Sequence, residues 1–317
     1  MDNVGLHNPS GGIVNIRSES LLQIELTDFA LKQLTIVAPA LKLLKERCYM
    51  DFDVNSSEPA AKISAPQLIS LEWNYYCGPR SVQFDKMANL SFLYAGRLPA
   101  HPFNLYLPHN PTGLLHCFEH IVCLYFTLVY RKDIANHPYL IEEMPRLPHV
   151  MLLSLNVEAK GHSFGASLFH VLRMCTNVRK LALAFDVSTE QLEEETGCPS
   201  GCVCDQPPNW KTEELQLSCL WNIEITGWRG AEKEVAFVER LFSWATALKE
   251  VRVTFHQSIT GSIAEDLCQT LLSFSRPETC TEFRTHGGLF KKVVGSSLCL
   301  ALAGSLSLGI IWLHSTL

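Results

Sequence analysis

Four stretches of this 317-residue chain share one pattern: VMLLSL at 150–155, VRKLAL at 178–183, LWNIEI at 220–225 and LKEVRV at 248–253. Apolar residues fill the first, fourth and sixth positions of each stretch, which is typical of a short strand that buries alternate side chains. The second pair of stretches follows the first pair at one offset, from 150 to 220 and from 178 to 248. The chain therefore contains an internal repeat.

A helical segment is predicted between the two strands of each pair, because apolar side chains recur there at helical spacing and share one face. They are Leu168, Val171, Leu172 and Cys175 in the first copy, and Val238, Leu241, Phe242 and Ala245 in the second. Strand, helix and strand in register predict an α/β leucine-rich-repeat solenoid, whose short parallel strands alternate with helices and whose units bury their apolar faces against their neighbours. Partial matches at 31–36, 68–73 and 90–93 extend this prediction toward the amino terminus.

Six segments resemble plant F-box/LRR-repeat proteins that carry a carboxy-terminal FBD domain. They are FALKxL at 29–34, ISAPQL at 63–68, CPSGCVCDQP at 198–207, NWKxEEL at 209–215, FVxRLF at 237–242 and SFSRPE at 273–278. The resemblance covers residues 17–283 and implies a repeat region that continues into an FBD-like α/β module. In that family the repeat captures a protein target for a ubiquitin ligase, and an F-box binds the ligase adaptor. This sequence contains no F-box, so we expect target capture without adaptor binding.

The expected organisation has five parts: a disordered amino terminus at 1–16, leucine-rich repeats at 17–189, an acidic and cysteine-rich loop at 190–209, the FBD-like module at 210–283 and a tail at 284–317.

The tail contains an uncharged stretch, Val293–Leu313, which follows Lys291 and Lys292. Its 21 residues are enough to cross the hydrocarbon core of a bilayer, about 30 Å thick, as a helix. We therefore expect a hydrophobic helix that either packs on the module or anchors the chain to an internal membrane from the cytosolic side. An unpacked extension is the third alternative.

Charge and cysteine content exclude other classes of protein. The formal net charge is −6 and we find no basic stripe, so a nucleic-acid partner is not expected. Met1–Gly12 lacks the apolar segment of a secretory signal, which predicts a place in the cytoplasm or nucleus. The 12 cysteines are then expected to be reduced.

Two motifs suggest chemistry. The sequence GHSFG at 161–165 matches the G-x-S-x-G turn of serine hydrolases, with Ser163 as the nucleophile. Two residues separate it from the strand, and the second copy has AEKEV at 231–235 instead, so we expect a strand–helix turn and no enzyme activity. The other motif is a set of thiols that would ligate zinc: Cys198, Cys202, Cys204 and Cys219. Only one cluster has ligand spacing, so neither a metal nor another cofactor is expected.

A protein partner of unknown identity is expected to bind the concave face of the solenoid. There, side chains that alternate with the buried ones point outward. They are Glu72, Asn74, Ser154, Asn156, Glu158, Lys180, Glu224, Thr226, Arg252, Thr254 and His256.

Overall fold

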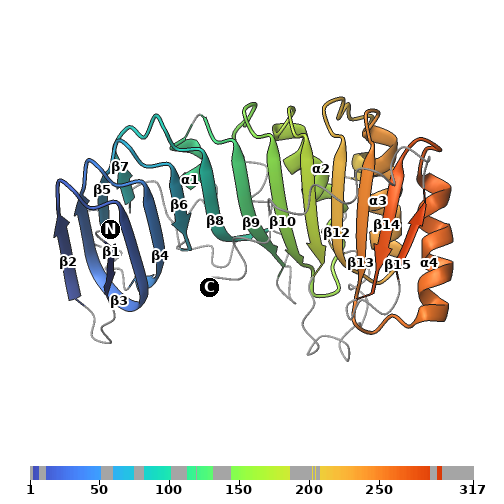
Figure 1. Cartoon of the computed structure of the whole chain (residues 1–317), viewed down its shortest axis with the longest axis horizontal. Helices are drawn as coiled ribbons and strands as arrows, with labels where there is room; N and C mark the ends of the chain where they lie inside the picture. The colour runs from blue at the N-terminus through green and yellow to red at the C-terminus, as the bar shows by residue number, and fades with distance from the viewer. Residues whose placement is uncertain are drawn as a thin grey trace. The chain divides into compact units, whose positions relative to one another are not determined.

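The computed structural model describes residues 3–6, 12–50, 60–74, 82–100, 113–118, 120–130, 144–185, 202, 204, 208–285 and 291–294. The chain divides into two compact units. The first unit comprises residues 1–178 and 188–215, and the second comprises 179–187 and 216–317. Both are α/β, with strands that are mostly parallel (Figure 1). The α/β class predicted from the repeat is therefore confirmed.

The strands of the first unit pair in the order β10-β9-β8-β6-β4-β3-β5-β7, with β1 and β2 also paired to β3, and all these pairings are parallel. Their bounds are Asn3–Leu6 (β1), Gly12–Arg17 (β2), Gln23–Val37 (β3), Leu43–Met50 (β4), Ala61–Ser64 (β5), Ser70–Trp73 (β6), Val82–Phe84 (β7), Phe92–Pro99 (β8), Cys123–Val129 (β9) and Leu152–Glu158 (β10). This unit also contains the helical segments α1 (Gly113–His116), α2 (Gly165–Met174) and the 3-10 helix η4 (Pro208–Lys211).

The long strand β3 belongs to two ladders. Its first part pairs with β4, where Ile24 lies opposite Leu44, and its second part pairs with β5, where Ile36 lies opposite Ile63. Among the described residues between 12 and 100, strands and not helices connect one strand of the β4-β6-β8 ladder to the next. Strands β5 and β7 are the examples. The predicted alternation of strands with helices is wrong there. Ala61 and Ile63 of β5 are buried at a period of two, which suits a strand packed on one face and not a helix.

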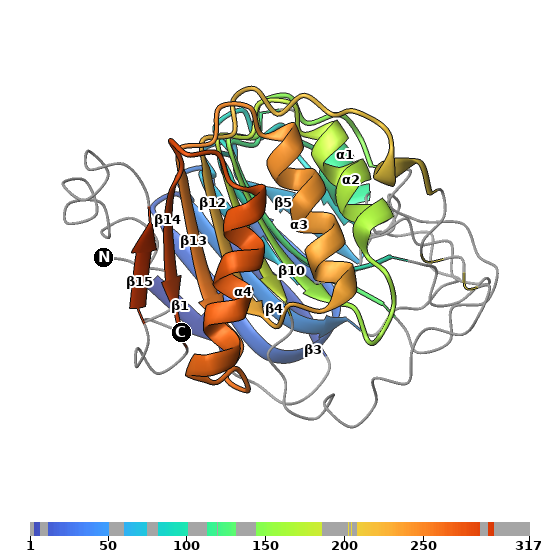
Figure 2. The same ribbon diagram turned by 90° about the vertical axis from the view of Figure 1, so that its right-hand side faces the viewer.

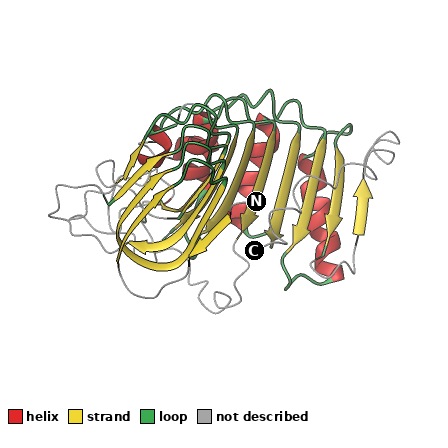
Figure 3. Cartoon of the chain, turned by 60° about the vertical axis from the view of Figure 1, so that its left-hand side comes forward, coloured by secondary structure: helices red, strands yellow, loops and turns green. Residues whose placement is uncertain are grey.

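One kind of turn precedes the strands. A backbone N–H donates to the carbonyl oxygen three residues earlier, from Leu41 to Ala38 at 3.0 Å, and the same bond recurs at Leu68, Leu90, Val150, Leu220, Leu248 and Thr279. Each of these leucines and the valine is buried, so the turn ends on a side chain that enters the core. In each unit these turns lie where the strands begin, among the loops drawn in green (Figure 3). The recurring turn therefore sets which residues of each following strand face the core.

The second unit contains the sheet β15-β14-β13-β12-β11 and two helices. The bounds are Lys180–Phe185 (β11), Asn222–Trp228 (β12), Glu250–Phe255 (β13), Cys280–Arg284 (β14), Lys291–Val294 (β15), Glu232–Trp244 (α3) and Gly261–Phe274 (α4). The helices cover one face of β12, β13 and β14 (Figure 2). Phe237, Val238 and Leu241 of α3 are fully buried, so the predicted apolar face of this helix forms core.

Both copies of the predicted repeat are strand–helix–strand. The first copy contains β10, α2 and β11, and the second contains β12, α3 and β13. The strands correspond residue by residue, since β10 spans Leu152–Glu158 and β12 spans Asn222–Trp228, and since β11 begins at Lys180 and β13 at Glu250.

The structure differs from the sequence prediction at both ends of the chain. Residues 3–6 and 12–17 are strands, where a disordered terminus was predicted. At the other end, β15 pairs antiparallel with β14, so Val293 and Val294 lie in a strand and do not begin a helix. The remainder of the predicted apolar helix, 295–313, lies outside the described residues. Among the residues that the structure describes, no helix is both long enough and apolar enough to span a bilayer.

Candidate functional site

The candidate site is the open face of each unit, which we define as the side chains at alternate strand positions that point away from the core. The strands β10, β11 and β13 show this alternation without interruption, buried and half-buried side chains taking turns. Ten of the predicted binding residues are half-buried on this face: Glu72, Asn74, Ser154, Asn156, Glu158, Lys180, Glu224, Thr226, Arg252 and Thr254.

His256 is the exception, because only 1% of it is exposed. Strand β13 ends at Phe255, and alternation ends with it. The imidazole instead organises the loop that follows, since its Nδ1 accepts the backbone N–H of Ser258 at 3.1 Å and its Nε2 lies 3.3 Å from an Arg229 nitrogen. The prediction that His256 faces a partner is wrong.

The centre of the open face in the second unit is Arg252. Strand register places it between Glu224 of β12 and Glu282 of β14. Its Nε lies 3.3 Å from Glu282 Oε2, and its Nη1 lies 3.9 Å from Glu224 Oε2. A third carboxylate, that of Glu250, lies 3.2 Å from Nη2. One guanidinium therefore holds three acidic side chains on three neighbouring strands.

Two further cations extend this network. Lys180 lies 3.8 Å from Glu224, and Arg284 lies 2.8 Å from Glu282. The amide nitrogen of Asn222 donates to Glu250 at 2.6 Å. We call the six charged residues the charge network: Lys180, Glu224, Glu250, Arg252, Glu282 and Arg284. It balances three acids with three bases. Sequence reasoning missed Glu282 and Arg284 because β14 lies outside the four repeat stretches, and it overlooked Glu250, which holds the same position in its stretch as Lys180 does.

The open face of the first unit combines ion pairs with tyrosines. Glu72 accepts a hydrogen bond from Arg47 Nε at 2.6 Å, which raises the pKa of the arginine. Glu158 pairs with both terminal nitrogens of Arg97. Tyr94 lies opposite Glu72 in the sheet, and Tyr125 lies opposite both Tyr94 and Ser154.

These tyrosines are packed into the face. Partial burial raises the pKa of the Tyr125 phenol to about 12, and burial also raises the pKa of Tyr94. Both are therefore neutral hydrogen-bonding groups at neutral pH. The sequence analysis did not include either tyrosine among the binding residues. Each nevertheless holds an alternate position of an apolar stretch, and strand register places the two opposite each other.

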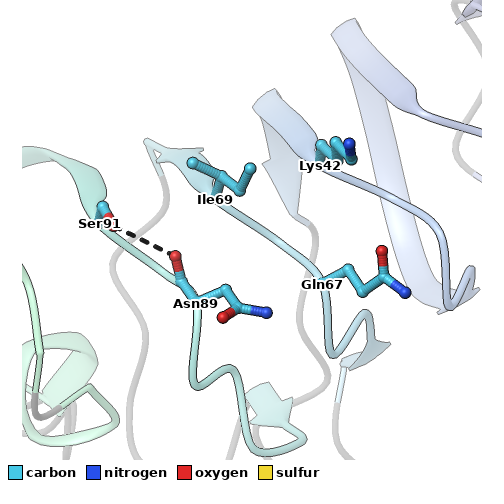
Figure 4. Close-up of a pocket in the computed structure, with 5 residues that line it drawn as sticks. All are labelled: Lys42, Gln67, Ile69, Asn89 and Ser91. Atoms are coloured by element: carbon cyan, nitrogen blue, oxygen red, sulfur yellow. Dashed lines mark hydrogen bonds between the residues drawn. The ribbon is translucent and has the colours of Figure 1, made fainter.

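A hollow of about 410 Å³ lies beside this face, where β4, β6 and β8 begin (Figure 4). It is lined by Lys42, Gln67, Ile69, Asn89 and Ser91. Backbone hydrogen bonds join its walls, from Ile69 N–H to Lys42 O and from Ser91 N–H to Ile69 O, both at 2.9 Å. The Ser91 hydroxyl donates to the Asn89 carbonyl oxygen at 3.2 Å. This lining offers a cation, two amides and a hydroxyl to a polar ligand.

No protein-family model, curated protein or solved structure matches the chain. Its function must therefore be inferred from the chemistry of the described residues.

The GHSFG segment forms a turn whose geometry differs from a nucleophile elbow. Lys160 and Gly161 have φ of 46° and 81°, and His162 N–H closes the turn on Ala159 O at 2.9 Å. In an elbow the strained backbone is at the nucleophile itself. Here it lies at the two residues before His162, so the turn redirects the chain before Ser163 is reached.

The predicted cysteine ligands separate into different places. Cys202 and Cys204 lie together beside His162 in the first unit, and their sulfur atoms and a ring nitrogen are all within 4.8 Å of one another. Cys219 belongs to the second unit, is exposed and is not part of this group. Cys198 lies outside the described residues. Among the described residues, His162, and not the candidate Cys219, lies with Cys202 and Cys204.

Proposed function

We propose that the chain is a non-catalytic scaffold of the leucine-rich-repeat type, which binds a protein target on its open face. The observation that carries the proposal is the charge network, together with the ion-paired first-unit face. Polar side chains at alternate positions of neighbouring parallel strands form a surface that recognises shape and charge and offers no reacting groups.

Preorganisation supports this function. Arg252 is held by three carboxylates, and its side chain is 26% exposed, so it loses little rotamer freedom when a partner binds. The charges compensate one another, which favours a partner with an alternating pattern of charge over a polyanion such as nucleic acid. Such a face selects its partner through complementary charges.

The tyrosines of the first unit support it as well. Tyr94 and Tyr125 are half-buried on neighbouring strands, and each combines a large apolar ring with a hydroxyl. Side chains of this kind are enriched at protein interfaces, because they bury much area with few rotatable bonds. Arginines beside them, such as Arg47 and Arg97, are enriched there too.

The resemblance to F-box/LRR/FBD proteins points in the same direction, since the repeats of that family capture targets. Under this proposal residues 17–189 correspond to the repeat region, and residues 210–283 correspond to the FBD-like module. The chain would then act as the target-recognition part of such a receptor.

The experiment compares proteins captured by tagged chains that differ at one face. Asn156→Arg and Thr254→Arg each add a bulky cation to the open face without removing a residue of the charge network. Gln269→Arg is the matched control, because Gln269 is exposed on α4, and the helices cover the opposite face of β12, β13 and β14 (Figure 2). We expect a specific partner to be retained by wild type and by the control, and lost from a face variant. Equal capture by all four chains would contradict the proposal.

A further inference from the structure

Three potential metal ligands converge on the turn before α2. The His162 ring and the Cys204 side chain are each only 2% exposed, and Cys202 is half-buried beside them. Nδ1 of His162 lies 3.5 Å from Cys202 Sγ. Both cysteines are present as thiols. The histidine and the cysteines are about 40 positions apart in the sequence. The cluster is therefore a tertiary feature.

The distance between Cys202 Sγ and His162 Nδ1 fits two ligands of one tetrahedral zinc ion. Zinc binds thiolate sulfur at about 2.3 Å and imidazole nitrogen at about 2.0–2.1 Å. Two such ligands at a tetrahedral angle are about 3.6 Å apart, by simple trigonometry on those bond lengths. The observed 3.5 Å between Cys202 Sγ and His162 Nδ1 agrees with this edge. A nitrogen and two sulfur atoms also form the ligand type that favours zinc over magnesium or calcium.

Neighbouring groups hold the ligands in place. The backbone N–H of Ser163 donates to Cys204 Sγ at 3.3 Å, and such a bond stabilises a thiolate. Tyr130 stacks on the His162 ring with 6.1 Å between ring centroids and 21° between planes. Its hydroxyl is fixed by Ser167 at 2.7 Å. The positive φ of Lys160 and Gly161 turns His162 toward this group.

We propose that His162, Cys202 and Cys204 bind a structural zinc ion, which joins the segment before η4 to the turn before α2. The described side chains supply three of the four ligands that tetrahedral zinc takes. Bonds from the three ligands to the ion would connect these two segments close to where η4 packs on α2. There, Trp210 is buried against Gly165. It thereby gives the GHSFG turn a role in binding metal, independent of whether the open face binds a protein.

Metal content and zinc affinity of the purified full chain test the site. Under reducing conditions we expect about one zinc ion per wild-type chain, because the described residues contain one such cluster of histidine and cysteine ligands. A chelator competition titration should show that Cys202→Ser, Cys204→Ser and His162→Ala each weaken zinc affinity by at least about 100-fold, more than a change in the groups around a metal usually does. Cys219→Ser is the control and should bind zinc as the wild type does.

A second measurement needs no variant and so does not depend on the folding of one. Zinc should protect Cys202 of the wild-type chain from iodoacetamide, while a chelator should restore its alkylation. Cys219, which is exposed, should react at the same rate in both states. Failure of the chain to take up micromolar zinc would overturn the proposal. So would equal loss of zinc in Cys219→Ser, or an alkylation rate of Cys202 that zinc leaves unchanged.

Discussion

Replacing Gly165 by alanine should destabilise the first unit, although the same change usually stabilises a helix. Gly165 is the first residue of α2, and a Cβ atom there would lie 2.4, 2.6 and 2.7 Å from three ring atoms of Trp210. Ordinary carbon contacts are about 3.5–4.0 Å, so the buried indole would have to withdraw by about 1 Å. Such overpacking costs about 1–3 kcal/mol, and alanine returns up to about 1 kcal/mol of helix propensity. With the full helix gain, the expected net loss is up to about 2 kcal/mol.

The chain supplies a matched control for this change. Gly261 is the first residue of α4, and a Cβ atom there would have no neighbour within 4 Å. Gly261→Ala should therefore stabilise the second unit by about 0.4–1 kcal/mol. Urea unfolding followed by tryptophan fluorescence and circular dichroism measures both variants. In a Trp210→Ala background, Gly165→Ala should become neutral or stabilising. The reasoning is refuted if Gly165→Ala raises stability in the wild-type background.

Three further changes test other parts of the structure. Arg252→Met leaves three carboxylates without their shared cation. We expect the free energy of unfolding in urea to fall by about 1 kcal/mol, and by less at high salt. A loss that does not depend on salt would argue against the charge network. Gly96 has a φ of +64°, and a Cβ atom there would lie 2.8 Å from the backbone of Asn74. Gly96→Ala should therefore lower the free energy of unfolding by at least about 2 kcal/mol. An unchanged urea midpoint would exclude this contact. Burial raises the pKa of the Cys175 thiol to about 12, so the unfolded state loses its proton first and stability should fall as pH rises from about 9 to 12. Cys175→Ala should have a shallower alkaline slope, by roughly 1.4 kcal/mol per pH unit in that window, and identical slopes would disprove the assignment.

The strand positions of the repeat could be predicted from sequence, because the template at 150–155, 178–183, 220–225 and 248–253 depends on local alternation. The structure places strands at each of them. A repeat at 41–46 was missed because Glu46, fully buried, occupies the last core position in place of an apolar residue. The stretch at 21–26 carries the whole template and could have been found.

Other features depend on residues that are distant in sequence. The return strands β5 and β7 span only four and three residues, which is too short for periodicity to separate a strand from a turn. The approach of His162 to Cys202 and Cys204 brings together residues about 40 positions apart, which spacing within one segment cannot reveal. Ligand spacing within one segment brought Cys198, Cys202 and Cys204 together as candidates, but it could not indicate a histidine about 40 positions away. Likewise, burial of His256 follows from where β13 ends, which alternation alone does not fix.

Crosslinking the captured partner to lysines of the chain tests the central claim most directly. Lys45 and Lys180 are half-buried on the open face, whereas Lys233 lies on α3 and Lys211 on η4. An amine-reactive crosslinker followed by mass spectrometry should join the partner to Lys45 or Lys180. Crosslinks confined to Lys233 and Lys211 would show that the partner binds elsewhere and would contradict recognition by the open face.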